Sequence, residues 1–251
     1  MDDTKILAGR LRELADRSYN SCIFTFTEFL GEAQLDLLLR MERELSYAGI
    51  ELYGGMDCSD RVVARFGRES ELGYDMEFPI VCLKISPLSE QFGEELTHRD
   101  YLGALMNLGI KRELLGDIIL YGKDAYLFCL DHIADYIKNS LLRVRHTSVS
   151  VAPAEGIPEN AGPRIQEQHV VVTSVRLDAV IARVWNLSRT QSQDLCREGK
   201  VFVNGRQRQN GSQDLKPEDR ISVRGFGKFI YAGEENVTGK GRFRILIWLF
   251  V

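Results

Sequence analysis

The 251-residue sequence lacks long apolar runs, paired cysteines and an export signal. Its longest uninterrupted apolar run is ILIWLFV at residues 245–251, which is far too short to cross a bilayer and predicts a buried strand. The five cysteines are odd in number, widely scattered and never spaced as Cys-x-x-Cys; they stand at positions 22, 58, 82, 129 and 196. We therefore expect reduced thiols, no disulfide framework and no zinc or other metal site.

The N-terminal residues also lack the pattern of a signal peptide. They carry two aspartates and place Ile6, Leu7, Leu11 and Leu14 at helical spacing, which predicts an amphipathic helix and a cytoplasmic protein without a membrane partner. Residues 1–78 are expected to form an α/β module. Its predicted elements are two helices and two short strands, at about 4–17, 28–47, 50–55 and 62–67.

Positive charge is scarce in the first two thirds of the chain. Residues 1–169 contain 18 lysines and arginines against 28 aspartates and glutamates, a net charge of −10. Residues 170–251 contain 14 against 8, a net charge of +6. A basic module on an acidic body indicates a polyanionic partner for the C-terminal part, although an excess of this size also occurs on ordinary solvated surfaces.

Prolines are few, and three of the six fall within residues 153–167, PAEGIPENAGPRIQE. This segment predicts a linker. Before it, residues 79–152 alternate between strand-like and helix-like patterns in the order βαββαβ, which predicts an RRM-like or ferredoxin-like domain. After it, residues 168–251 are expected to form a third domain. The predicted fold class is therefore α+β.

Two arginines stand at the predicted starts of helices in the third domain. Ser188 is a natural helix N-cap and Gly199 a natural C-terminal stop, so residues 188–198 predict a helix that Arg189 begins. A cation is mildly unfavourable at that end of a helix, whereas a guanidinium there suits a phosphate. Arg176 opens the preceding helix in the same way. The Asn204-Gly205 pair then predicts a hairpin turn.

These observations define a candidate RNA-binding strip that reads phosphate and shape rather than base edges. The alternative is a small α+β domain with solvated arginines and a routine serine cap. The strip consists of Arg176, Ser188, Arg189, Gln191, Lys200, Asn204, Arg206 and Arg208. Lys111 and Arg112 are either partners of a helix C-terminus or a second RNA contact.

Residues 175–206, VRLDAVIARVWNLSRTQSQDLCREGKVFVNGR, resemble the alpha-L RNA-binding motif, the domain type of ribosomal small-subunit protein four. Ser192 departs from the usual alanine and is expected to soften helix packing. HRDYLGALMNLGIKRELLGDI at residues 98–118, followed by this motif, is similar to the YlmH family of bacterial RNA-binding proteins.

The resemblance implies that ribosomal RNA of the large subunit is the main partner and that tRNA is a second candidate. A related heat-shock protein with the same motif acts on large subunits that carry stranded peptidyl-tRNA. The implied process is the rescue or quality control of stalled translation.

Two other classes of function stay open. One is an interaction or scaffold protein linked to cell division, and the other is an RNA-modifying enzyme similar to pseudouridine synthases. Only about 70 residues follow Asp178, too few for a synthase domain, so this aspartate is expected to be structural. With no nucleotide-loop or nucleophile motif in the sequence, we expect no enzyme activity, no cofactor and no small-molecule substrate. Tyr126 and Phe128 are expected either to pack in a core or to stack on RNA bases.

Overall fold

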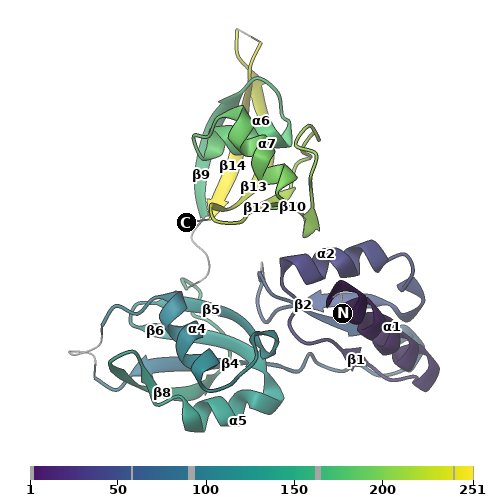
Figure 1. The fold of residues 1–251 in the computed structure, drawn as a ribbon, viewed down its shortest axis with the longest axis vertical. Coiled ribbons are helices and arrows are strands. Elements are labelled where there is room, and N and C mark those ends of the chain that lie inside the picture. Colours follow the sequence, from purple (N-terminus) through teal and green to yellow (C-terminus); the bar gives the residue numbers. More distant parts are fainter. Residues whose placement is uncertain (1–2, 58, 90–93, 162–164, 240, 251) are drawn as a thin grey trace. The chain divides into compact units, whose positions relative to one another are not determined.

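The computed structural model describes residues 3–57, 59–89, 94–161, 165–239 and 241–250 (Figure 1). The chain forms two compact units, Met1–Gly162 and Pro163–Val251. In the part of the chain that the structure describes, none of the helices combines the length and apolar character that a membrane crossing requires.

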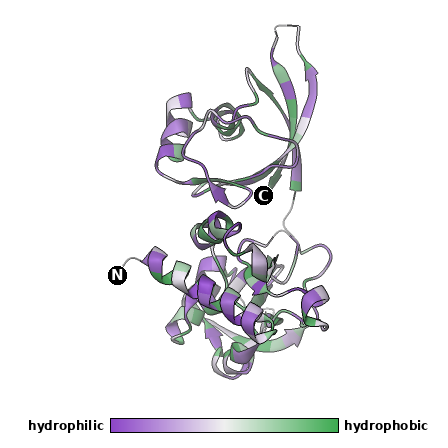
Figure 2. Cartoon of the chain, turned by 90° about the vertical axis from the view of Figure 1, so that its right-hand side faces the viewer, coloured by the Kyte–Doolittle hydropathy of each residue, from purple (hydrophilic) through white to green (hydrophobic). Residues whose placement is uncertain are grey.

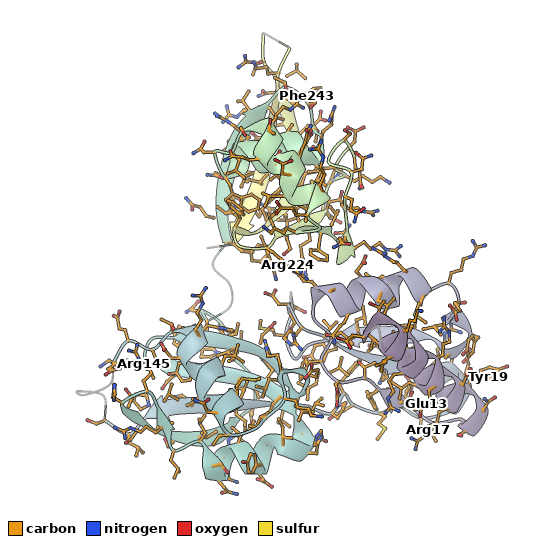
Figure 3. All side chains as sticks on the ribbon, in the orientation of Figure 1. Glu13, Arg17, Tyr19, Arg145, Arg224 and Phe243 are labelled. Carbon is orange, nitrogen blue, oxygen red and sulfur yellow. The ribbon has the colours of Figure 1, made fainter. Side chains whose placement is uncertain are left out.

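The first half of unit 1 is a small α/β module. Its three-stranded antiparallel sheet has the order β1-β3-β2, and Leu11, Leu14 and Leu38 pack beside it in one apolar cluster. On the outer side of the first helix, Glu13, Arg17 and Tyr19 point to solvent (Figure 3). The elements are α1 (Asp3–Ser21), β1 (Thr25–Phe26), α2 (Glu32–Met41), η1 (Ser46–Ala48), β2 (Ile50–Tyr53), β3 (Val63–Phe66) and α3 (Glu69–Leu72).

Helix α2 begins four residues later than the sequence pattern predicts. Residues 27–30 lie outside the helix because their backbone bonds to the chain around β3. The Thr27 amide donates to the Ala64 carbonyl at 2.9 Å, and Leu30 and Val62 exchange two bonds at 2.7 and 3.2 Å. These bonds satisfy backbone groups that a helix would otherwise use, so the helix begins only after Gly31.

The second half of unit 1 confirms the predicted βαββαβ order. Its sheet is antiparallel with strand order β5-β6-β4-β8-β7, in which the first four strands give the ferredoxin-like arrangement and β7 is an added edge strand. The elements are β4 (Ile80–Pro87), α4 (His98–Asn107), η2 (Arg112–Leu114), β5 (Leu115–Tyr121), β6 (Asp124–Leu130), α5 (Asp131–Ser140), β7 (Arg143–Val144) and β8 (Thr147–Ala154).

Both faces of the interior strand β6 are buried. Leu127 and Cys129 belong to the core that includes Tyr101 of α4 and Ile137 of α5. The alternate residues Tyr126 and Phe128 lie in a second cluster with Phe29 and Val63 of the N-terminal module, and their exposures are only 6% and 2%. The structure therefore favours core packing for both aromatics over stacking on RNA bases.

Arg61 joins the two halves of unit 1 through backbone carbonyls. Its Nε donates to Leu115 O at 2.9 Å, and its Nη2 donates to Phe29 O at 2.9 Å and Arg112 O at 3.3 Å. Nearby, the carboxylate of Asp117 accepts from a backbone amide of the N-terminal module at 2.6 Å. A polar layer thus accompanies the apolar cluster between the module and the sheet.

The predicted linker at residues 153–167 overlaps strands at both ends, because residues 153–154 belong to β8 and residues 165–167 to the first strand of unit 2.

Unit 2 contains a six-stranded antiparallel sheet in the order β11-β10-β12-β13-β14-β9, with two helices on one face (Figure 1). The elements are β9 (Ile165–Val172), α6 (Leu177–Val184), α7 (Arg189–Arg197), β10 (Val201–Val203), β11 (Arg206–Gln207), β12 (Arg220–Val223), β13 (Gly227–Val237) and β14 (Phe243–Phe250).

The turn and the terminal strand of unit 2 form where the sequence predicts them. Asn204 and Gly205 both have positive φ, 51° and 76°, as the turn between β10 and β11 requires. Strands β13 and β14 make a long hairpin along which hydrophobic and hydrophilic residues are interspersed (Figure 2). Ile245 and Ile247 are fully buried, which confirms the predicted buried strand near the end of the sequence.

Candidate nucleic-acid interface

The starts of α6 and α7 meet at one edge of unit 2. Leu177, Val180 and Ile181 bury one side of α6 against the sheet, and Leu195 and Cys196 do the same for α7. The apolar sides of both helices pack against the same core, and their first turns lie together, with polar side chains both inside this contact and on its outer side.

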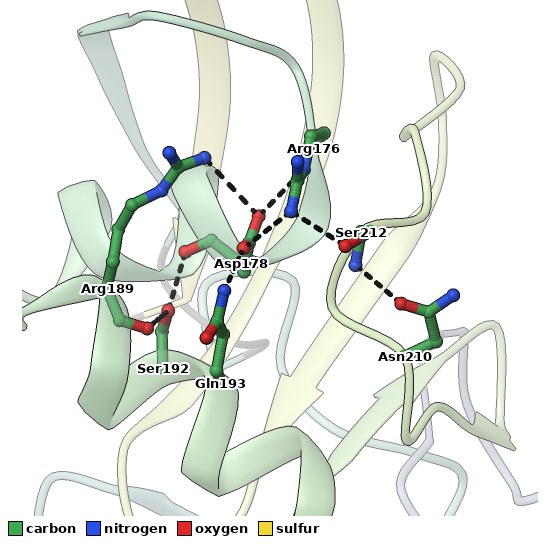
Figure 4. A network of polar contacts seen from close by, with 7 residues as sticks. All are labelled: Arg176, Asp178, Arg189, Ser192, Gln193, Asn210 and Ser212. Carbon is green, nitrogen blue, oxygen red and sulfur yellow. Dashed lines mark hydrogen bonds and ion pairs between the residues drawn. The ribbon is translucent and has the colours of Figure 1, made fainter.

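The carboxylate of Asp178 lies at the centre of this region and is completely buried (Figure 4). Arg176 donates two hydrogen bonds to it, from Nε to Oδ1 at 3.2 Å and from Nη2 to Oδ2 at 2.9 Å. Gln193 Nε2 of α7 donates to Oδ2 at 3.0 Å. Arg189 approaches from the other side, with its Nη2 3.8 Å from Oδ1. The two arginines at the helix starts therefore converge on a single buried anion.

A loop distant in sequence completes the arrangement. Arg176 Nη2 also donates to Ser212 Oγ at 2.7 Å, and the Ser212 amide donates to Asn210 Oδ1 at 2.9 Å. The amide of Asp178 donates to Gly211 O at 2.8 Å. A side chain at Gly211 would begin 2.9 Å from the Asp178 Cβ, so only glycine allows the loop to approach this closely.

Ser192 strengthens the contact between the helices rather than softening it. Its hydroxyl is fully buried and lies 2.8 Å from Asp178 O and 3.1 Å from Arg189 O, within hydrogen-bond reach of both acceptors. The alanine expected at this position could make neither bond. The serine therefore links the first turn of α6 to that of α7.

Ser188 and Gln191 form the cap of α7. The Gln191 amide donates to Ser188 Oγ at 3.2 Å, and the Ser188 amide donates to Gln191 Oε1 at 2.8 Å. This reciprocal pair is a capping box, which explains why the helix begins here. Both side chains are exposed at the helix start but are already engaged with the backbone.

The other predicted RNA-binding residues lie at the β10–β11 hairpin. Asn204 is engaged in the fold: its Nδ2 donates to Asp219 Oδ1 at 2.8 Å, and its Oδ1 accepts from the amide of Arg220 at 2.8 Å. Lys200 Nζ lies 2.7 Å from Glu198 Oε2. The structure thus brings Arg176 and Arg189 together at the helix starts and places the rest at the hairpin, namely Lys200, Asn204, Arg206 and Arg208.

Lys111 and Arg112 follow α4 but do not belong to it, because the helix ends at Asn107. The Arg112 guanidinium donates to Leu115 O at 2.6 Å and Gly116 O at 3.1 Å. Burial, and after it the positive charge of the neighbouring Arg61, lower the pKa of Arg112 to about 10. Arg112 therefore stabilises the junction within unit 1, whereas Lys111 is exposed and its contact with RNA stays a prediction.

Sequence reasoning gave Asp178 a structural role but did not anticipate that it binds both arginines. The available signal was that Asp178 is the single acidic residue of α6, a helix with six apolar residues and one arginine. Ser212 carried no signal, because only the fold brings it to Arg176. Arg224, labelled in Figure 3, was not among the predicted residues; its guanidinium lies 4.9 Å from the centroid of the Phe202 ring.

A shallow surface hollow adjoins Arg189 on the side of α6. Its volume is about 340 Å³, and it combines apolar and polar lining residues. The residues that line the hollow include Val172, Ala179, Arg183, Asn186 and Arg189.

Among the residues that the structure describes, no group of three or more histidine, cysteine, aspartate or glutamate side chains is arranged to hold a metal ion.

Two family models match the chain. The putative RNA-binding domain in YlmH matches residues 74–156, and the S4 domain matches residues 175–221. The chain is also similar to the ribosome-associated protein quality control protein P2 of Bacillus subtilis (strain 168), with 28% identity over 220 residues, which are 87% of this chain and 84% of that protein.

Among solved structures, the chain is similar to the cell division protein ylmH from Streptococcus pneumoniae, with 21% identity and a TM-score of 0.47. The match covers 61% of this chain and 92% of that chain. The two family models fall on the central sheet domain and on the helices that carry Arg176 and Arg189.

Proposed function

We propose that this chain, which belongs to the YlmH family, is a ribosome-associated protein that binds RNA without catalysing a reaction on it. In this proposal unit 2 binds ribosomal RNA of the large subunit, and tRNA is a further partner. The process it serves is the rescue or quality control of stalled translation, in line with the name of its relative from Bacillus subtilis.

The observation that carries the proposal is the pair of guanidiniums at the starts of α6 and α7. Arg176 and Arg189 both lie within 4 Å of the Asp178 carboxylate, so the cluster has a net charge of +1. Guanidinium groups bind phosphate oxygens through paired hydrogen bonds. The net charge of +6 on residues 170–251 supplies a favourable field for a polyanion around this point.

Unit 1 would contribute in a different way. Its residues belong to the acidic part of the chain, which disfavours nonspecific binding of phosphate. The aromatic face of its sheet is covered by the N-terminal module, so base stacking on Tyr126 and Phe128 is blocked. We therefore propose that unit 1 engages tRNA, a protein or a second ribosomal surface by shape and specific contacts.

The first test is sedimentation of a cytoplasmic extract through sucrose gradients at low and high salt. We expect the protein to migrate with large subunits at low salt and to be released at high salt, because each neutralised phosphate releases bound counterions. Purified tRNA is tested separately by filter binding. Migration at the top of the gradient under every condition would contradict ribosome association.

Two variants of α7 test the assignment of the interface. Arg189→Ala should lose binding by about 1.5–3 kcal/mol, or roughly ten- to a hundredfold, because a charge-assisted hydrogen bond to phosphate is removed. Arg197→Ala removes the same charge from the last turn of the helix, where it pairs with Asp194 at 3.0 Å, and serves as the control. Equal losses in the two variants would show that only overall charge matters.

A further inference from the structure

We infer that Asp178 is a positioning residue that holds Arg176 and Arg189 as the two sides of a binding site for a single backbone phosphate group. The inference deepens the proposed function and rests on it. Asp178 itself is buried and would not touch the RNA. It would act through the two arginines that it orients.

Burial of Asp178 fixes the position of its carboxylate. A buried charge is tolerated only when it is paired and hydrogen-bonded. The backbone amide of Asp178 donates to the Gly211 carbonyl, and its carboxylate oxygens accept hydrogen bonds from Arg176 and Gln193. Asp178 is therefore held by three parts of unit 2: its carboxylate by Arg176 at the start of α6 and by Gln193 of α7, and its backbone by the loop around Gly211.

The two arginines use this anion differently. Arg176 makes a bidentate contact, and only 33% of its side chain is exposed. Arg189 lies 3.8 Å away, which is within ion-pair range but too long for a hydrogen bond, and 54% of its side chain is exposed. Arg189 is thus attracted to the carboxylate while its donors stay available to a second anion.

Two guanidiniums beside one carboxylate leave one positive charge uncompensated. A phosphodiester carries one negative charge, and its oxygens suit the planar fork of donors on each guanidinium. A phosphate that bridges Arg176 and Arg189 would complete the cluster as an alternating arrangement of two cations and two anions. Because the carboxylate already orders the side chains, less conformational entropy is lost on binding.

The Asp178→Asn variant gives opposite predictions for the two explanations of binding. If only net charge matters, removal of an anion from the interface should raise the affinity for RNA. If Asp178 positions the arginines, the affinity should fall, by roughly tenfold, despite the added positive charge. Asparagine has nearly the same shape, so packing around the buried position is kept.

The measurement is the affinity of the full chain for purified large-subunit ribosomal RNA as a function of salt. Asp194→Asn is the matched control, because it removes the same charge from an exposed ion pair on α7 and should leave the affinity unchanged or slightly raised. Thermal unfolding followed by tryptophan fluorescence checks that unit 2 is intact, since Trp185 and Trp248 both lie there.

A second experiment leaves Asp178 in place and remains informative if its variant fails to fold. Arg176→Ala, Arg189→Ala and the double variant are compared for affinity. A shared phosphate and a shared carboxylate predict that the double variant loses much less than the product of the two single losses. Independent losses that multiply would overturn the inference.

The outcomes separate this inference from the proposed function. A wild-type chain that does not bind the ribosomal RNA refutes the proposed function itself. A wild-type chain that binds, together with an Asp178→Asn variant that binds equally well or more tightly, refutes only the positioning role. Loss of affinity in Asp178→Asn with unchanged melting, and retention in Asp194→Asn, supports it.

Discussion

Replacement of Arg61 by methionine should loosen the N-terminal module from the central sheet domain. Methionine preserves much of the length and apolar character of the side chain but removes the guanidinium. Three backbone carbonyls, those of Phe29, Leu115 and Arg112, would then lose a donor. Two of these bonds are 2.9 Å long and one is 3.3 Å, so the two short bonds dominate the effect.

The size of the effect follows from two opposing contributions. A hydrogen bond from a charged donor contributes about 1.5–3 kcal/mol, and an unsatisfied buried carbonyl costs about 1–3 kcal/mol. Leu115 O keeps its bond from the Arg112 guanidinium, and Arg112 O keeps its bond from the Leu115 amide, so the second cost concerns Phe29 O. In the opposite direction, burial lowers the pKa of Arg61, which reports the cost of desolvating the guanidinium, and methionine removes that cost. We expect a net loss of about 2–4 kcal/mol in the free energy of unfolding of unit 1.

Urea denaturation can assign this loss to one unit. Both tryptophans lie in unit 2, so their emission follows that unit alone, whereas far-ultraviolet circular dichroism follows both units. In Arg61→Met we expect the circular dichroism midpoint to fall by about 1–2 M while the tryptophan midpoint stays constant. Arg10→Met is the control, because Arg10 makes an exposed ion pair with Glu13 within α1.

Two results would refute this reasoning. An unchanged circular dichroism transition would mean that the three bonds contribute nothing to the stability of unit 1. An equal shift of the tryptophan transition would mean that the two units unfold together rather than independently.

Two further predictions concern the same junction. Burial raises the pKa of Asp117 to about 6, so its ionised form opposes folding. As the pH falls from 7 to 5, the free energy of unfolding of the wild type should therefore rise by about 1 kcal/mol relative to that of Asp117→Asn, measured by urea unfolding at both pH values. A change of opposite sign would contradict the raised pKa. Gly116→Ala should destabilise unit 1 by about 1–3 kcal/mol in the same assay, because its Cβ would stand 2.7 Å from the ring of Phe29; Gly103→Ala, in open space on α4, is the control.

Much of the local structure of this protein could be predicted because short segments encode it. Ser188 and Gly199 mark the ends of α7, and Asn204-Gly205 marks the hairpin turn, since each residue type suits a conformation that few others adopt. The order βαββαβ of the central domain followed from periodicity alone. The start of α2 was misplaced, because bonds to the chain around β3 hold residues 27–30 outside the helix.

The site was predictable in its composition but not in its arrangement. Arg176 and Arg189 stood out in the sequence because each occupies a helix start where a cation is unfavourable. Their common partner Asp178 is the single acidic residue of α6, but its position in the sequence does not identify its partners, and Ser212 reaches the cluster only through the loop around Gly211. Gln191 was expected at the interface; its side chain caps α7 at that helix start, and its contact with RNA stays a prediction.

Neighbouring residues and composition were enough to predict the start of α7, the hairpin turn at Asn204-Gly205, the order of elements in the central domain and the uneven distribution of charge. Tertiary structure alone decided which face of the central sheet is covered and which anion holds the two arginines. Both depend on contacts between segments far apart in the chain, such as Phe29 with Phe128 and Arg176 with Ser212. Such contacts form only when the apolar faces pack together, and no local pattern specifies them.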